Sequence, residues 1–179
     1  KKGRQKMKEQ LKRTVFGLAA GAALLLSTSA AFAEDDEALV SFKTLSPATA
    51  LELAQAALEA CRNGDYQVAV AVVDRFGILQ VALRDRFAGS HTPDTAYRKA
   101  WTSVSFRTDT LSLTESTQAG KEASGIRHVT NALMVGGGVP VTAAGALVGG
   151  IGISGAPSGE ADDECAKAGI EAIVDKLDF

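Results

Sequence analysis

The amino-acid sequence predicts an α+β domain: an antiparallel sheet of roughly five strands flanked by helices. Short runs rich in Val, Ile and Ala come in closely spaced pairs joined by tight turns, such as the turn at 74–77. Helical patterns lie before, between and after these pairs. They do not alternate with single strands, as a doubly wound parallel fold would require. The predicted order is therefore helix, two strands, a helical middle, three strands and a final helix.

The first elements are an amphipathic helix and a hairpin. Ser46 is a candidate N-cap, and Pro47 suits the first helical turn, where a missing N–H costs nothing. Apolar residues then recur at helical spacing until a stop near Gly64. The run 66–74 predicts a strand buried on both faces, and the alternating segment 78–85 predicts its antiparallel partner.

The middle of the chain is predicted to be helical. Thr92 supplies a candidate capping hydroxyl for a helix that runs to about Arg107, and 109–120 predicts a short helix or turn. One line of this longer helix carries only small residues, which would let it lie close to the sheet: Ala96, Ala100 and Ser103.

The last third is rich in glycine and predicts three strands followed by a helix. The strands are expected at 132–135, 139–143 and 146–154, with a turn at Gly145. Four acidic residues crowd the first turn of the closing helix, which suits the positive end of its dipole. Its predicted buried stripe is Ala166, Ile170, Ile173 and Leu177.

The start of the sequence has the features of a secretory signal. Lys12 and Arg13 form a charged region, 15–26 is apolar, and Ala31-Phe32-Ala33 resembles a cleavage site. The apolar run is too short to span a bilayer, although a retained membrane anchor is the alternative interpretation.

We therefore expect 1–33 to be removed after Ala33, leaving a flexible acidic segment at 34–45 and a single domain at 46–179. The product would be secreted or periplasmic, with no stable membrane insertion. It would carry 12 Lys or Arg and 20 Asp or Glu, because the leader holds seven of the 19 basic and one of the 21 acidic residues. This acidic balance argues against a nucleic-acid partner.

Two cysteines, Cys61 and Cys165, remain in the exported chain. In a compartment that permits disulfides, one pair suggests one bridge; two separately buried thiols are the alternative. With 103 residues between the two cysteines, a bridge would stabilise the fold by roughly 4 to 5 kcal/mol in the chain-entropy description.

Several catalytic and cofactor motifs are absent or poorly placed. The residues 150–155 match the dinucleotide pattern GxGxxG, but they lie within a predicted strand and precede an acidic turn that would repel a pyrophosphate. Ser154 lacks the spacing of a nucleophile elbow, and the two histidines, His91 and His128, form no triad order. No zinc motif occurs, and the acids at 34–37 suggest either loose iron or calcium binding or simply a solvated terminus.

Six of the twelve basic residues of the exported chain lie between 75 and 107, beside His91, Tyr97 and Trp101. Such a surface suits a flat, partly apolar anion, because guanidinium and ammonium groups pair with carboxylates and aromatic faces stack on a ring. The alternative is that these are ordinary surface charges around a packed tryptophan. The six residues are Arg75, Arg84, Arg86, Arg98, Lys99 and Arg107.

Three segments resemble a known family. They are VAVVDRFG at 70–77, RKAWT at 98–102 and the long stretch from GGGVPV to the closing helix at 136–173. Together they are similar to the GlcG/HbpS-like haem-binding family, which includes haem-degrading domains and PduO C-terminal-like domains. The likeness extends from about Leu45 to the C-terminus, and most of the matching positions are structural glycines.

The resemblance implies a profilin-like fold, a haem cofactor and assembly into a homo-oligomer. It also suggests where the ligand contacts lie: around the loop and helix start, at Arg84, His91, Thr92, Tyr97, Arg98 and Lys99. The assignment of His91 as an iron ligand is our own inference, since members of the family need not share it.

We therefore predict an exported protein that binds haem or a related tetrapyrrole, for uptake, sequestration or sensing. One alternative is an enzyme or accessory protein that acts on a small anionic metabolite or a corrinoid. Another is a glycine-rich sheet that builds an oligomer without any ligand.

Overall fold

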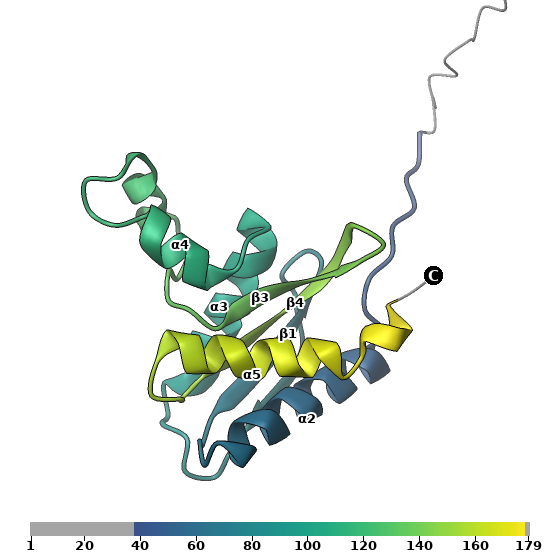
Figure 1. Cartoon of the computed structure of the whole chain (residues 1–179). Coiled ribbons are helices and arrows are strands. Elements are labelled where there is room, and N and C mark those ends of the chain that lie inside the picture. Colours follow the sequence, from purple (N-terminus) through teal and green to yellow (C-terminus); the bar gives the residue numbers. More distant parts are fainter. Residues whose placement is uncertain (1–37, 178–179) are drawn as a thin grey trace, which may run out of the picture. The chain divides into compact units, whose positions relative to one another are not determined.

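The described residues of the computed structural model, 38–177, form an α+β fold with a four-stranded antiparallel sheet flanked by helices (Figure 1). The predicted leader, its cleavage site and the acids at 34–37 lie outside these residues. In chain order the elements are α2 (Pro47–Asn63), β1 (Ala69–Asp74), β2 (Leu79–Arg84), α3 (Thr92–Phe106), α4 (Thr110–Ser116), the 3₁₀ helix η1 (Glu122–His128), β3 (Gly138–Ala143), β4 (Ala146–Ser154), α5 (Gly159–Glu171) and the 3₁₀ helix η2 (Val174–Lys176).

The sheet has the strand order β2-β1-β4-β3, and every neighbouring pair is antiparallel. Both predicted hairpins are present, β1 with β2 and β3 with β4. They are joined through β1 and β4, where Val70 lies opposite Ile153. The predicted fold class is therefore confirmed, but the sheet has four strands within the described residues, and not five.

The strand predicted at 132–135 is not formed, because side chains satisfy its backbone in place of a neighbouring strand. The N–H of Leu133 donates to the Thr102 hydroxyl at 2.9 Å, and the Thr114 hydroxyl donates to the carbonyl of Met134 at 3.0 Å. The segment consequently runs over α3 and α4 without pairing with the sheet.

Helices cover both faces of the sheet. Alternate side chains of β1 point to opposite sides: Val70 and Val72 face the core under α2 and α5, whereas Ala69 and Ala71 face α3. Figure 1 shows α5 and α2 side by side in front of the strands and α3 behind them. The larger core therefore lies between the sheet and the α2–α5 layer.

Glycines on the sheet let α3 approach unusually closely. A Cβ atom on Gly152 would lie 2.0 Å from the Ala96 carbonyl oxygen, and one on Gly138 would lie 2.3 Å from the Lys99 carbonyl oxygen. The small residues predicted to face the sheet, Ala96, Ala100 and Ser103, are all fully buried. The glycine-rich stretch thus serves helix–sheet packing, and it is not a phosphate loop.

The closing helix is shorter than predicted. It ends at Glu171, and a turn then leads into η2. Ile173 and Leu177 are buried as predicted, with 1% and 7% of their surface exposed, although they lie beyond the α-helix. The buried apolar positions were predicted correctly, but the backbone that carries them changes from an α-helix to a turn and a 3₁₀ helix.

The predicted disulfide between Cys61 and Cys165 is confirmed. It links α2 to α5, and the two Cα atoms are 5.3 Å apart. Both cysteines are buried in the larger core. Within residues 38–177, no helix is both long enough and apolar enough to cross a membrane.

Candidate functional site

The loop between β2 and α3 brings several predicted site residues to one end of the sheet. Arg84 ends β2, and its Nη1 atom donates to the carbonyl of Ala88 at 2.6 Å. Thr92 begins α3, and its buried hydroxyl donates to the carbonyl of Gly89 at 2.8 Å. The loop is therefore fastened at both of its ends.

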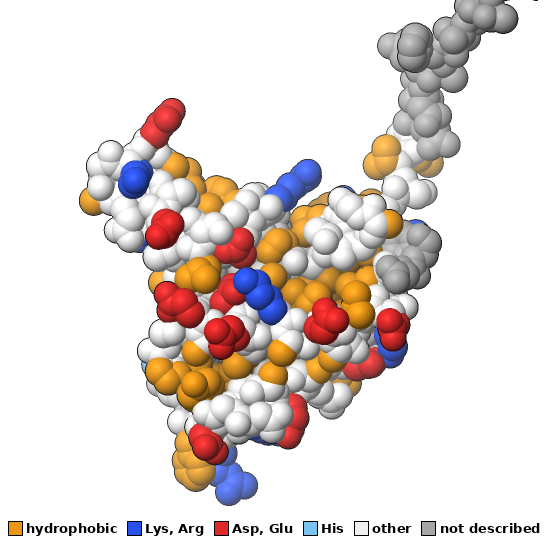
Figure 2. All heavy atoms as spheres, viewed as in Figure 1, with side chains coloured by type: hydrophobic (Ala, Val, Ile, Leu, Met, Phe, Trp, Pro, Cys, Tyr) orange, Lys and Arg blue, Asp and Glu red, His pale blue; other side chains and the backbone are white. Residues whose placement is uncertain are grey.

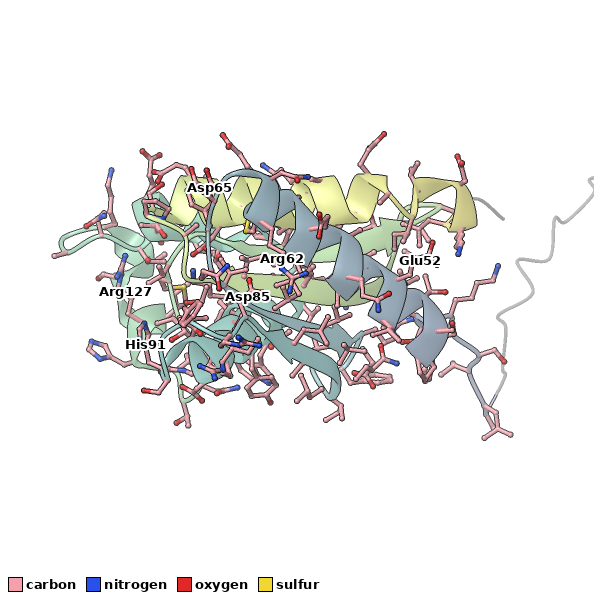
Figure 3. All side chains as sticks on the ribbon, turned by 90° about the horizontal axis from the view of Figure 1, so that it is seen from below. Glu52, Arg62, Asp65, Asp85, His91 and Arg127 are labelled. Carbon is pink, nitrogen blue, oxygen red and sulfur yellow. A yellow bond between two sulfur atoms is a disulfide. The ribbon has the colours of Figure 1, made fainter. Side chains whose placement is uncertain are left out.

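His91 caps the start of α3 through its backbone, while its side chain is exposed and makes no hydrogen bond. The prediction that Thr92 caps this helix was wrong, because Thr92 lies inside the first turn and its hydroxyl turns back to Gly89. In Figure 3, His91 is labelled at one end of the molecule. The imidazole nitrogens of His91 are thus open to a ligand.

Beside α3, the sheet presents an apolar surface with a basic edge. Tyr97 packs on Ala69 and Ala71 of β1, whose cross-strand partners on β2 are Arg84 and Ala82. Because cross-strand partners point to the same face, all of these side chains lie on the α3 side of the sheet. Leu79 lies there too, opposite Val73, and is 48% exposed. We call this surface the α3 shelf: Leu79, Ala82, Arg84 and Tyr97, together with His91, which ends the loop after Arg84 and begins α3.

Arg98 turns away from the α3 shelf. Its Nε and Nη2 atoms donate to the carbonyls of Asn131 and Ala132, at 3.3 and 3.1 Å. The guanidinium therefore fastens the segment after η1 to α3.

Lys99 lies in the interior. Only 2% of its surface is exposed, and its Nζ atom donates to Asp162 Oδ2 at 2.7 Å and to the carbonyl of Ile153 at 2.9 Å. The other carboxylate oxygen of Asp162 accepts the N–H of Ala156 at 3.0 Å. Burial raises the pKa of the Asp162 carboxyl, and the charge and hydrogen bond of Lys99 hold that rise back.

This ion pair was not predicted from the sequence, although the position of Lys99 on the helix indicated that it is buried. Lys99 lies three residues after Ala96 and four before Ser103, so its position belongs to the buried face of the helix. Nothing local indicates that its partner is Asp162, 63 residues further along the chain.

The rest of the predicted basic cluster is dispersed. The Arg75 guanidinium lies over the rings of Phe42 and Phe76, 4.9 and 5.7 Å from their centroids. Trp101 is half-buried against a separate cluster that contains Leu113, Ala132 and Met134. Arg75 therefore lies outside the α3 shelf, whereas the Trp101 ring also lies beside Gly77 of the β1–β2 turn, close in the chain to Leu79 of that shelf.

The opposite side of the molecule is acidic. Figure 2 shows more Asp and Glu side chains than Lys and Arg on the face that carries α5. Glu160, Glu164 and Glu171 of that helix are all exposed. An anionic ligand is consequently disfavoured there relative to the α3 side.

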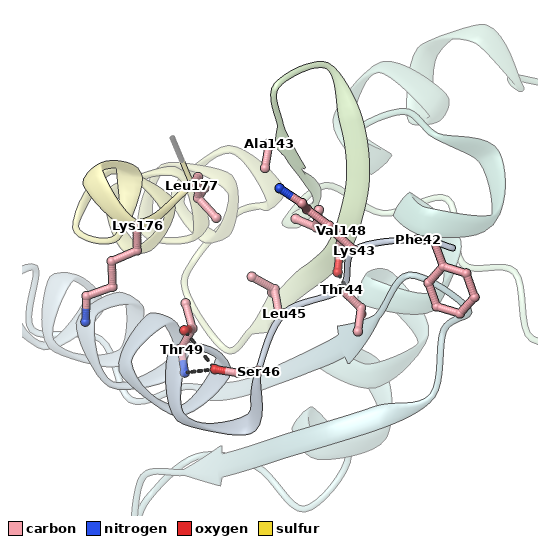
Figure 4. A pocket seen from close by; sticks show the side chains of 10 residues that line it. All are labelled: Phe42, Lys43, Thr44, Leu45, Ser46, Thr49, Ala143, Val148, Lys176 and Leu177. Carbon is pink, nitrogen blue, oxygen red and sulfur yellow. Dashed lines mark hydrogen bonds between the residues drawn. The ribbon is translucent and has the colours of Figure 1, made fainter. Parts of the chain in front are cut away.

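A hollow lies where the segment 42–49 passes the end of the β3–β4 hairpin (Figure 4). Leu45, Val148 and Leu177 give it an apolar wall. The ammonium of Lys176 at its rim pairs with Glu52, so this hollow offers little free charge.

The α3 shelf carries one imidazole, and no group of three or more metal-ligating side chains occurs within the described residues. A bare metal ion needs several protein ligands, whereas a porphyrin iron needs only one or two because the ring supplies four. The single imidazole of the α3 shelf therefore fits a porphyrin iron better than it fits a bare metal ion.

Comparison with known proteins identifies relatives with this fold. HbpS from Streptomyces reticuli, solved as a mutant in which two glutamates are replaced by aspartate, is 41% identical and has a TM-score of 0.71 over 74% of this chain and 89% of HbpS. A structure described as the PduOC:Heme complex is 34% identical, with a TM-score of 0.68 over 73% of this chain and 95% of PduOC.

The corrinoid adenosyltransferase PduO of Salmonella typhimurium is 35% identical over 124 residues. These residues are 68% of this chain but 37% of that enzyme, so the chain matches little more than a third of the curated relative. Residues 45–171 match the family described as "Haem degrading protein HbpS-like". The chain therefore belongs to the HbpS-like family of haem-degrading proteins.

Proposed function

We propose that this protein binds haem or a related tetrapyrrole on the α3 shelf, and that it acts by binding, with any degradation of haem incidental. The proposal is supported by the haem complex of PduOC, which is 34% identical to this chain. The observation that carries it is the exposed, unbonded imidazole of His91 at the start of α3, the helix whose Tyr97 packs on the apolar surface of β1.

In this proposal each shelf residue has a separate task. His91 ligates the haem iron through an imidazole nitrogen, as neutral imidazoles do in many haem proteins. Arg84 uses its remaining N–H groups to pair with a propionate carboxylate. The Tyr97 ring and the Leu79 side chain cover part of a porphyrin face.

The other predicted contacts have different tasks. The Thr92 hydroxyl holds the loop in place, so it acts on the ligand only through the position of His91. Arg98 and Lys99 are engaged with backbone carbonyls and with Asp162, and we leave both out of the ligand set.

Titration with hemin tests the proposal. The wild-type protein should shift and sharpen the Soret band saturably, and His91→Ala should weaken binding at least about tenfold or change the iron coordination spectrum. His128→Ala is the matched control, because it removes the other exposed histidine and should leave the titration unchanged. A wild-type protein without a Soret shift, or a His91→Ala variant identical to wild type, would contradict the proposal.

A corrinoid is a second candidate ligand, because PduO is a corrinoid adenosyltransferase with 35% identity to this chain. The matched part is about a third of that enzyme, and the catalytic activity therefore does not transfer with it. Competition between cobalamin and hemin distinguishes the two: displacement of hemin by equimolar cobalamin would favour the corrinoid.

We also propose that the protein is exported through the predicted leader and assembles into a homo-oligomer that serves haem uptake, sequestration or sensing. Self-assembly is supported by the exposed apolar side chains at the β1–β2 turn and on the edge strand β2: Phe76, Ile78 and Leu79. Light scattering of the apo-protein measures the assembly, and N-terminal sequencing of exported material locates the cleavage. A monomeric protein would contradict the proposed assembly. An uncleaved N-terminus would contradict the proposed export through a cleaved leader.

A further inference from the structure

A hollow lined by small and polar residues lies in the excursion between α4 and β3, away from the α3 shelf. Its volume is about 480 Å³, and one continuous stretch of chain lines it. No carboxylate and no aromatic or branched apolar side chain is part of the lining. The lining residues all fall within 117–128, and those with polar side chains are Thr117, Gln118, Ser124, Arg127 and His128.

Arg127 holds the hollow in shape. Its Nε atom donates to the carbonyl of Thr117 at 2.6 Å, and its Nη2 atom donates to the carbonyl of Thr114 at 2.9 Å. The buried Thr117 hydroxyl in turn donates to the carbonyl of Leu113. The end of α4 and the 3₁₀ helix η1 are therefore clamped together before any ligand arrives.

Four polar groups around this hollow make no hydrogen bond within the part of the chain that the structure describes. They are the Nη1 atom of Arg127 (labelled in Figure 3), the hydroxyl of Ser124, the imidazole of His128 and the side-chain amide of Gln118. All four can donate, and the guanidinium is always positively charged. Outside the lining, the neighbouring residues Lys121 and Glu122 carry opposite charges.

We propose that this hollow binds a small anion that carries carboxylate or phosphate groups. Unused donors, a fixed guanidinium and the absence of lining acids all favour negative charge. A porphyrin would find no large apolar side chain there, because Ala119, Gly120 and Gly125 are the lining residues without a polar side chain. The site is therefore distinct from the α3 shelf and does not depend on haem binding.

Calorimetric titration of the full chain with citrate and, separately, with inorganic phosphate tests this inference. At least one of the two should bind saturably, and the one that binds identifies the group recognised. The double variant Ser124→Ala/His128→Ala removes two donors without touching the Arg127 clamp, and it should weaken binding at least about tenfold. Glu122→Gln, in the same loop but outside the lining, is the matched control and should bind no more weakly than wild type.

Three results would overturn the inference. They are no binding of either anion, equal affinity in the double variant, and loss of hemin binding together with anion binding in the double variant. The last result would show that the hollow belongs to the haem surface. A double variant that binds hemin normally but has lost the anion supports a separate site. Failure of hemin binding in the wild type, with the anion site intact, would count against the proposed function alone.

Discussion

At the scale of single residues, the stability of the fold depends most on the buried ion pair of Lys99 and Asp162. Its two side chains are 2% and 5% exposed, and they connect α3 to the first turn of α5. Two ions that leave water lose several kcal/mol each, so the pair is stable only while both members are present and hydrogen-bonded.

Replacing Lys99 by Met should therefore destabilise the protein by about 3 to 5 kcal/mol, since it leaves the Asp162 carboxylate buried without its cation. Urea unfolding measures the loss. Lys176→Met is the matched control, because it breaks an ion pair whose side chains are about half exposed, and it should cost less than about 1 kcal/mol. Equal losses in the two variants would show that the buried pair has no special weight.

The pH dependence of the Lys99→Met variant follows from Asp162. Burial already raises the pKa of this carboxyl, and loss of the ammonium raises that pKa further. The folded variant then keeps a proton that the unfolded chain releases above about pH 4, so its stability falls as the pH rises through the raised pKa. The loss relative to wild type should be larger at pH 8 than at pH 5, and a pH-independent loss would contradict this account.

Single residues also show where sequence prediction stops. Local turn and helix signals correctly placed Arg84 in the second strand and His91 just before a helix, whereas their contact with a ligand stays a prediction. Lys99 was expected on the surface because lysine is rarely buried, yet its partner lies 63 residues away. Partners that only tertiary packing brings together have no local pattern in the sequence.

At the scale of elements, the approach of α3 to the sheet decides the fold. The backbone of α3 lies against glycines of β3 and β4, where side chains would normally separate the layers. This contact was foreseeable in part, because small residues recur on one side of the helix and glycines recur on the strands. The sequence did not show which glycine faces which turn of the helix.

Gly152→Ala should destabilise the protein by about 3 kcal/mol, because the new methyl group would lie 2.0 Å from the Ala96 carbonyl oxygen and neither backbone can yield easily. Gly125→Ala is the control, since nothing lies within 4 Å of a Cβ atom there, and its effect should stay within about 0.5 kcal/mol. Thermal unfolding of both variants checks the difference. A Gly152→Ala protein as stable as the control would mean that α3 moves freely on the sheet.

The false strand at 132–135 is instructive for the same reason. Its short apolar run suits a strand, and Met134 and Ala132 are buried. The backbone, however, finds its partners in the hydroxyls of Thr102 and Thr114. The apolar run thus suggested a strand, whereas the choice between strand and loop depended on polar groups from two other helices.

At the scale of the whole molecule, the two hairpins were predicted from local turns, but their union was not. The pairing of β1 with β4 connects residues about 80 positions apart, such as Val70 and Ile153. The same two parts of the chain are joined on the helical layer by the disulfide between Cys61 and Cys165. The bridge therefore reinforces a long-range contact, whose loop folding must close against chain entropy.

Replacing both cysteines by alanine should lower the free energy of unfolding by about 4 to 5 kcal/mol, because the bridge closes a loop with a sequence separation of 104 residues and so restricts the unfolded chain. Urea unfolding of the double variant and of the wild type, both without reductant, measures the difference. Since both cysteines are buried, the wild type should also resist reduction by dithiothreitol until it is partly unfolded. A loss below about 1 kcal/mol would mean that the sheet pairing alone holds the two halves together.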